Sequence, residues 1–227
     1  MIAPGSQQRI RSILEDLESV RENLLALSDD IWLSIDHNNN DAMQQGIEFK
    51  HEYNAKMESF ARVAEEISVM VQQFTNVRTT EENTETTATS KEARDRVTAE
   101  LDTREPHRLD EDFTYKRPYA YRIGDHAVTG TTTWRSLYED VLRHLRQIDG
   151  DVFRSLPDRE EQISRRGNPH FARSPEALRV ASHLEDDIYI EINMSAQMIV
   201  TMIQTVLPIF GLNGTEMTVY LREDRDA

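Results

Sequence analysis

The chain has 227 residues, of which 38% are apolar and 30% are charged, with 41 acidic residues against 26 basic ones and no cysteine. The absence of cysteine excludes disulfides, thiolate metal sites, iron–sulfur clusters and cysteine nucleophiles. The apolar fraction is low for a single compact globule of this length, so we expect part of the chain to be extended helix or disordered.

The basic residues are 22 arginines and only 4 lysines, and the formal net charge is −15. Acid-rich, lysine-poor surfaces suit the high-salt cytoplasm of a halophile, because salt screens their self-repulsion and hydrated carboxylates keep them soluble. The first residues show no basic region followed by an apolar run. The most apolar stretch, residues 198–210, is shorter than the ~20 residues of a membrane span. We therefore expect a cytoplasmic protein without membrane contact.

Apolar residues in the first third recur at alternating spacings of three and four, which is typical of helices with one apolar seam. The polar stretch 36–41 between the two series predicts a turn, so residues 1–75 are expected to form an antiparallel, coiled-coil-like helical hairpin. Self-association or docking of a partner protein through residues 10–74 is expected, and an isolated hairpin is the alternative. The two series are Ile10, Ile13, Leu17, Val20, Leu24, Leu27 and Ile31, and then Tyr53, Met57, Phe60, Ala64, Ile67, Val71 and Phe74.

Residues 76–112 have few aliphatic side chains and dense charge. Such a composition buries too little surface to offset the entropy of ordering. We expect an acidic flexible linker with at most a transient helix over residues 91–101.

Residues 113–227 are expected to form a small α+β domain with a mixed sheet and helices on one face. The predicted elements are a hairpin around Gly124 and Asp125, a helix from Trp134, a short helix over 152–156, a strand over 186–193, a helix after Ser195 and a last strand over 217–221. Pro208 predicts a kink or an early end of the last helix.

Candidate catalytic groups are few, and we assign no catalytic residue, metal site or cofactor. Ser195 stands where a helix N-cap is expected, and capping is the commoner role. The segment GTTTWRS lacks the lysine and second glycine of a phosphate-binding loop. The histidines are scattered singly along the chain and do not form a metal-ligand pattern; those of the second half are His126, His144, His170 and His183.

An alternative enzymatic hypothesis is a divergent metal-dependent nuclease of the PD-(D/E)xK type, in which carboxylates bind a divalent ion and a lysine assists the attacking water. Asp158, Asp187 and Glu191 match that pattern faintly. Asn193 occupies the position of the lysine, which leaves the attacking water without that assistance.

A cluster of arginines interrupts the acidic chain. Residues 117–180 hold eleven arginines, no lysine and nine acidic residues. Arginine offers bidentate donors that match phosphate, and an aromatic ring beside it can stack on a base. The predicted anion or nucleic-acid site comprises Arg165, Arg166, His170, Phe171 and Arg173. The alternative is that these arginines pair with the chain's own acids, namely Glu160, Glu161 and Glu176.

Several short features follow one another over residues 117–221, and the residues that form them are Tyr119, Trp134, Arg166, Phe171, Tyr189, Glu191, Asn193, Ser195 and Ala196. Their order resembles an uncharacterised small α/β module of prokaryotic restriction, phage-defence and mobile-element proteins. The resemblance implies a setting linked to nucleic acid and implies no particular reaction.

Together these features predict a non-enzymatic adaptor, in which a helical hairpin self-associates or docks a partner and a second domain binds an anionic partner, most simply nucleic acid. A purely structural protein–protein scaffold and the nuclease are the two alternatives.

Overall fold

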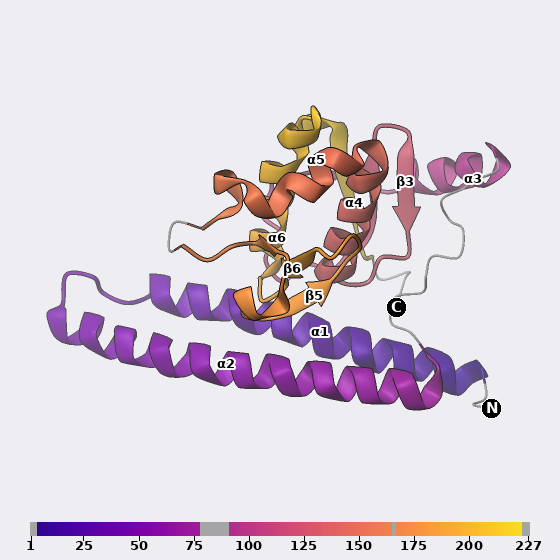
Figure 1. Ribbon diagram of the computed structural model, residues 1–227. Helices are drawn as coiled ribbons and strands as arrows, with labels where there is room; N and C mark the ends of the chain where they lie inside the picture. The colour runs from indigo at the N-terminus through magenta and orange to yellow at the C-terminus, as the bar shows by residue number, and fades with distance from the viewer. Residues whose placement is uncertain (1–3, 78–90, 165–166, 224–227) are drawn as a thin grey trace.

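Two long N-terminal helices lie side by side beneath an α+β part in the computed structural model, which describes residues 4–77, 91–164 and 167–223 (Figure 1). The helices are α1 (Pro4–Leu33) and α2 (Asn40–Thr75). The Tyr53 hydroxyl donates to the Leu24 carbonyl at 2.8 Å, and Lys50 Nζ lies 2.7 Å from Asp29 Oδ1. Later residues of α2 therefore face earlier residues of α1, and the two helices are antiparallel.

The start of α2 follows from the polar turn that the sequence shows. The Asn39 side chain accepts hydrogen bonds from the backbone N–H groups of Asp41 and Ala42, which the first helical turn leaves without partners. Asn76 ends the helix with a left-handed φ of 55°, a conformation that asparagine tolerates better than most residues.

The strands form two antiparallel sheets. The four-stranded sheet has the order β1-β7-β2-β3, with β1 (Pro106–Arg108), β7 (Met217–Leu221), β2 (Pro118–Ile123) and β3 (His126–Thr129). The three-stranded sheet has the order β4-β6-β5, with β4 (Phe171–Ala172), β6 (Tyr189–Glu191) and β5 (Ala181–His183). The predicted α+β class is correct, but the single mixed sheet is wrong because every described strand pair is antiparallel.

The predicted hairpin and last strand are confirmed. Ile123 pairs with His126 across the two-residue turn at Gly124 and Asp125, and Gly124 has the positive φ that tight hairpin turns require. The strand β7, which comes last in the chain, inserts between β1 and β2, so three segments that are distant in sequence meet in one sheet.

Three α-helices complete this part: α4 (Trp134–Ile148), α5 (Gly150–Ser155) and α6 (Ala196–Val206). Thr133 caps α4 by accepting from the Ser136 N–H, and Ser195 caps α6 as predicted. Pro208 follows the α-helical turns of α6 and lies in the 3-10 helix η4 (Leu207–Phe210), so the predicted early end is confirmed. Further 3-10 helices are η1 (Leu156–Asp158), η2 (Glu160–Gln162), η3 (Pro175–Ala177) and η5 (Gly214–Glu216).

The core of the α+β part is built around the apolar face of α4. These side chains recur at helical spacing and are at most 1% exposed, which confirms the predicted helix face: Trp134, Leu137, Val141, Leu142 and Leu145. The Trp134 indole N–H donates to the Lys116 carbonyl at 2.8 Å, so its polar atom is satisfied within the core.

The flexible linker predicted over residues 76–112 is wrong in its second half. The helix α3 (Lys91–Leu101) and the strand β1 lie there, whereas residues 78–90 are outside the described residues. Leu101 is fully buried and packs with Val97, Ala120 and Tyr220. A few apolar residues are enough to order this segment, because the face of β2 and β7 supplies the rest of the contact.

Replacing Leu101 with alanine tests this packing. We expect Leu101→Ala to lower the free energy of unfolding by about 2–4 kcal/mol, the usual cost of a leucine-sized cavity. The control Leu33→Ala removes a side chain that is 74% exposed and should change stability by less than about 0.5 kcal/mol. Chemical denaturation followed by circular dichroism measures both, and equal values would contradict a packed α3.

Candidate functional site

The structure does not support Phe171 as a stacking group. Phe171 lies on β4, pairs with Ile190 of β6 and is 1% exposed. Its ring belongs to the main core cluster and is not available to a base. The sequence prediction was wrong here because the two-residue strand β4 is too short to show the alternation that reveals a buried position.

The other described residues of the predicted anion site, Arg173 and His170, interact at least in part with the protein itself. Arg173 donates to Asp158 Oδ2 at 2.6 Å and to the Arg154 carbonyl at 3.0 Å, although its side chain is half exposed. Burial lowers the pKa of His170, which favours its neutral form. Arg165 and Arg166 lie outside the described residues.

Most arginines of the cluster pair with the protein's own acids. Six of the nine described arginines between residues 117 and 180 form ion pairs with aspartate or glutamate, as the alternative hypothesis predicted, although their partners are not Glu160, Glu161 or Glu176. They are Arg117, Arg135, Arg143, Arg146, Arg154 and Arg173.

Two of the three acids of the nuclease hypothesis, Asp158 and Glu191, have other roles. The Glu191 carboxylate accepts hydrogen bonds from the backbone N–H groups of Arg179, Val180 and Asn193 at 2.7–3.3 Å. Asp158 is the partner of Arg173. Within residues 4–77, 91–164 and 167–223, no group of three or more metal-ligating side chains lies close enough to hold an ion.

Folding does bring two of the scattered histidines together. The rings of His126 on β3 and His144 on α4 stack with their centroids 3.7 Å apart and their planes 5° from parallel. A ring nitrogen binds a metal in the plane of its ring, so two stacked faces do not direct their lone pairs at one ion. Burial also lowers the pKa of His144.

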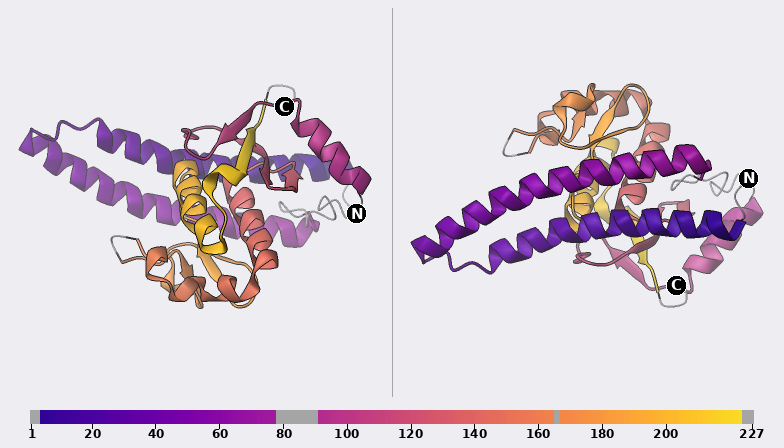
Figure 2. Two further views of the ribbon diagram at one scale, coloured as in Figure 1. Left: turned by 90° about the horizontal axis from the view of Figure 1, so that it is seen from above. Right: turned by 90° about the horizontal axis from the view of Figure 1, so that it is seen from below.

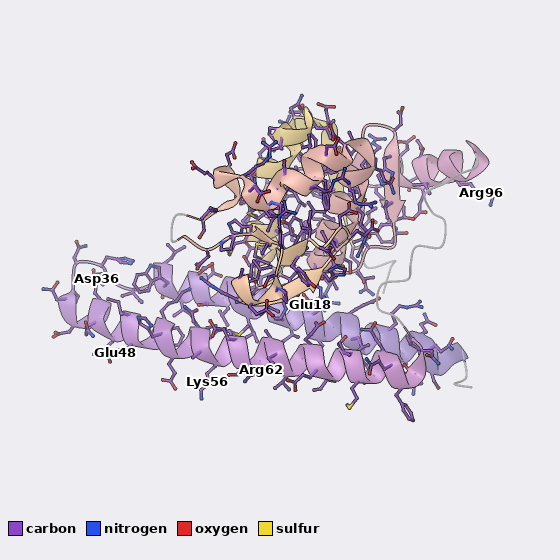
Figure 3. All side chains as sticks on the ribbon, viewed as in Figure 1. Glu18, Asp36, Glu48, Lys56, Arg62 and Arg96 are labelled. Carbon is purple, nitrogen blue, oxygen red and sulfur yellow. The ribbon has the colours of Figure 1, made fainter. Side chains whose placement is uncertain are left out.

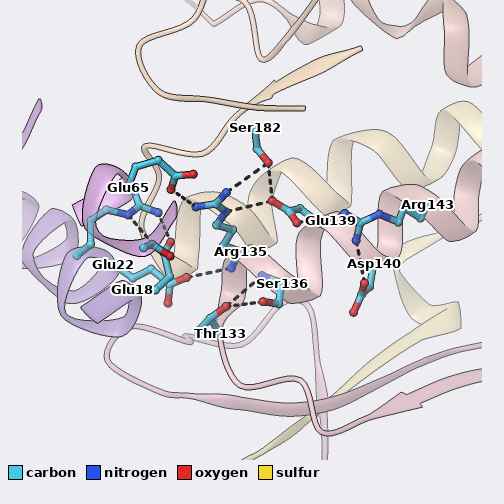
Figure 4. Close-up of polar contacts among 12 residues, drawn as sticks. Glu18, Glu22, Glu65, Thr133, Arg135, Ser136, Glu139, Asp140, Arg143 and Ser182 are labelled. Carbon is cyan, nitrogen blue, oxygen red and sulfur yellow. Dashed lines mark hydrogen bonds and ion pairs between the residues drawn. The ribbon is translucent and has the colours of Figure 1, made fainter. Parts of the chain in front are cut away.

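Arg135 is the centre of a polar network that the sequence prediction missed (Figure 4). It lies in the first turn of α4, and its guanidinium lies 2.9 Å from Glu65 of α2 and 3.0 Å from Glu139 of α4. Ser182 of β5 contacts both Arg135 and Glu139. The pairing of Arg135 with Glu139, four residues later on α4, can be predicted from the sequence. The contacts with Glu65 and Ser182 cannot, because these residues are distant along the chain.

Glu22 extends this network from α1. Its carboxyl oxygen accepts the Arg135 backbone N–H at 2.9 Å, and its side chain is buried. Burial, together with the nearby Glu18, raises the pKa of Glu22 to about 8, so the group is protonated at neutral pH. Burial also opposes ionisation of Glu18, but its ion pair with Arg21 outweighs this and lowers the pKa of Glu18.

Two further contacts hold α1 against the α+β part. Arg117 lies 2.9 Å from Asp16, and the Tyr115 hydroxyl donates to Asp30 at 2.6 Å. With Glu22, these contacts cover four turns of α1. The helix pair is therefore docked on the α+β part along about half of α1.

Some apolar residues of the helix pair are buried, among them Leu14, Met57, Ala61 and Ala64. Others are exposed, and we call seven of them the outer seam. Their side chains are 41–86% exposed, and they are Ile13, Val20 and Leu27 of α1 and Val63, Ile67, Met70 and Phe74 of α2.

The outer seam lies on the opposite side of each helix from Glu22 and Glu65, which contact Arg135 of the α+β part. Seen from below, the ribbons of α1 and α2 lie in front of the α+β part (Figure 2, right). The predicted seam of each helix is therefore buried only in part, because Ile13 and Ile67 belong to the predicted repeats and yet are exposed.

Between residues 60 and 74 of α2, the charged residues lie outside the outer seam. The charged residues between Phe60 and Phe74 are Arg62, Glu65 and Glu66, which fall on one side of the helix. Glu65 reaches Arg135, so that side faces the α+β part. Nearer the start of α2, Glu48 and Lys56 project outward (Figure 3).

Comparisons with known proteins yield no family model, no curated protein and no solved structure that matches the chain. The resemblance to a prokaryotic defence module therefore stays a prediction. No helix in the described ranges is long and apolar enough to cross a membrane.

The substitution Glu22→Gln tests the buried carboxyl. Between about pH 4.5 and pH 8 the unfolded Glu22 is ionised while the folded one keeps its proton, so stability falls as pH rises through this window. Glutamine keeps the acceptor for the Arg135 N–H and carries no such proton. We expect the variant to gain on the order of 2 kcal/mol over wild type near pH 8 and much less near pH 5.

Urea unfolding at the two pH values measures this gain, and the exposed Glu52→Gln is the matched control. A constant difference between Glu22→Gln and wild type at both pH values would mean that Glu22 does not hold its proton in the folded protein.

Proposed function

We propose that the protein is a non-enzymatic scaffold or adaptor that docks another helical surface through the outer seam. The observation that carries this proposal is the exposure of seven large apolar side chains on one face of the helix pair. Contiguous apolar patches of more than a few hundred Å² on soluble proteins mark interaction sites.

The repeat of the outer seam supports a helical partner. Phe60, which is half-buried, and the four α2 members of the seam are spaced alternately by three and four residues. In α1 the seam residues are spaced by seven. Both spacings match the heptad of coiled coils, in which apolar side chains of one helix insert between those of another.

The candidate catalytic groups support a non-enzymatic role, because the fold uses them structurally. Ser195 caps α6, and Glu191 binds three backbone N–H groups. A serine or a carboxylate held in this way is not directed at a substrate.

Binding of an anionic partner such as nucleic acid stays a prediction that rests on Arg165 and Arg166. The described members of that loop lend it little support, since Phe171 is buried and Arg173 is paired with Asp158. The same holds for a role in a prokaryotic DNA-related or defence system.

The docking proposal is tested with the double variant Val63→Lys/Met70→Lys in the full chain. The control Glu66→Lys makes the same change in net charge on the same helix, outside the outer seam. Each protein is tagged, incubated with source-cell lysate and untagged full chain, crosslinked and purified, and mass spectrometry identifies what is retained. We expect wild type and control to retain the same chains and the double variant to lose at least tenfold of that signal.

Retention of the same chains by the double variant would contradict docking through the outer seam. Circular dichroism first establishes that all three proteins have the same helix content and thermal midpoint.

The nucleic-acid prediction is tested separately by fluorescence anisotropy of labelled DNA and RNA at low and high salt. Because this prediction rests on Arg165 and Arg166, we expect the binding to weaken as salt rises and to be at least tenfold weaker in Arg165→Glu/Arg166→Glu. Equal binding by wild type and this variant would contradict the nucleic-acid prediction.

A further inference from the structure

A polar cavity lies where the helix pair meets the α+β part. Its volume is about 280 Å³, just below the ~300–1,000 Å³ of most ligand pockets, so a ligand that fits it is small. Figure 4 shows Glu18 of α1, Glu65 of α2 and Arg135 of α4 close together at this junction, and all three line the cavity. None of the seven side chains of the outer seam lines it, so the cavity is separate from that surface.

Arg21 brings hydrogen-bond donors to this cavity. It lines the cavity, its side chain is 2% exposed, and its Nε and Nη2 atoms donate to the two carboxylate oxygens of Glu18. The remaining nitrogen, Nη1, is buried and has no acceptor within residues 4–77, 91–164 and 167–223. A buried donor is costly to leave unpaired. A ligand that places an acceptor oxygen at Nη1 therefore gains this hydrogen bond.

The charged groups of the cavity wall already have partners of opposite charge. Arg21 pairs with Glu18, and Arg135 pairs with both Glu65 and Glu139. A charged ligand would lose its hydration in the cavity and find no unpaired charge in return. The wall therefore favours a molecule without net charge.

Glu15 is the remaining acid of the wall, and it does not provide an unpaired carboxylate. Burial raises its pKa, which opposes ionisation, while a hydrogen bond with Thr132 and the charges of Arg11 and Arg222 stabilise the ionised form. The ionised form therefore has arginines near it, and the protonated form has no charge. Neither form leaves an unpaired charge for a cationic ligand.

The wall offers donors and acceptors together. Arg21 Nη1 can donate, and the carboxylate oxygens of Glu18 and Glu65 can accept. Ser68 contributes a hydroxyl, and Leu14 contributes an apolar surface for C–H groups. A hydroxyl group donates and accepts, so one molecule with several hydroxyl groups can satisfy both kinds of partner. We infer that the cavity binds a small, uncharged, polyhydroxylated molecule of the size of a monosaccharide or a cyclic polyol.

Such a ligand contacts both parts of the molecule, because α1 and α2 form one side of the cavity and α4 forms another. It binds the docked arrangement of the two parts and stabilises that arrangement by mass action. The inference goes beyond the proposed docking function and does not depend on the outer seam.

Isothermal titration calorimetry of the untagged full chain with glucose and with myo-inositol tests the inference. Sugars and polyols stabilise most proteins because they are excluded from the surface, so saturable heat, and not a higher thermal midpoint, is the measure of binding. We expect saturable one-to-one binding of at least one of these two probes and none of acetate or methylammonium. Failure of both uncharged probes to bind, or equal binding of either charged probe, would overturn the inference.

Two variants test whether the bound probe occupies the cavity. Arg21→Met removes Nη1 and keeps a long unbranched side chain, whereas Ser68→Leu fills the cavity and leaves every charge in place. We expect each to raise the dissociation constant of the probe at least about tenfold. The matched control is Ser59→Leu, at an exposed position of the same helix outside the cavity, and it should have little effect. Circular dichroism first establishes that all variants have the helix content of wild type.

Unchanged binding by Ser68→Leu would overturn the cavity as the site. A crystal structure of wild type with the probe gives the direct answer: a probe oxygen ~3 Å from Arg21 Nη1 supports the inference, and water molecules alone in the cavity contradict it. The double variant Val63→Lys/Met70→Lys, which tests docking through the outer seam, should bind the probe as wild type does. The two proposals can therefore fail independently.

Discussion

The contact of Arg135 with Glu65 and Glu139 determines how the two parts of the molecule are arranged. It links α2 to the first turn of α4, and the adjacent backbone N–H binds Glu22 of α1. A half-buried arginine cannot lose its charge and has a fixed fork of donors, so acids at defined positions stabilise it. The network thus favours one docked orientation of the helix pair and leaves the opposite side of that pair exposed.

The many acidic residues of the chain also provide ion-pair partners for other arginines. In a chain with many carboxylates, an arginine that lies near the surface meets an acid of its own chain before it meets a phosphate. Arg146 with Asp186 and Arg117 with Asp16 both join segments that are far apart in sequence. The arginines between residues 117 and 180 therefore act largely as internal connections between elements.

These two features support the proposal that the outer seam is the surface for association. Several acids of the helix pair, among them Glu22 and Glu65, contact the α+β part, and the other side of the pair carries the apolar residues that the pair itself does not bury. An acidic surface resists contact with acidic neighbours, so an uncharged strip is the place where a helix of another chain can approach at the lowest electrostatic cost.

The sequence alone predicts the helices and turns that are stabilised by interactions between residues close together in the chain. Spacings of three and four predict α1, α2 and α4, the caps at Asn39, Thr133 and Ser195 mark where helices begin, and Gly124 marks a hairpin turn. Each of these signals lies within a few residues of the structure that it predicts. The hydrogen bonds and side-chain packing involved are formed inside one element or one turn, so no knowledge of the remainder of the chain is needed.

The features that the sequence did not reveal depend on contacts between distant segments. Both sets of apolar residues on α1 repeat at helical spacing, and only the position of α2 and of the α+β part decides that Leu14 is buried while Ile13 is exposed. Leu101 looked like part of a linker until β2 and β7 supplied its surroundings. Arg135 looked like one arginine among many because Glu65 precedes it by 70 residues. Burial and pairing belong to surfaces brought together by folding, and a one-dimensional pattern does not contain them.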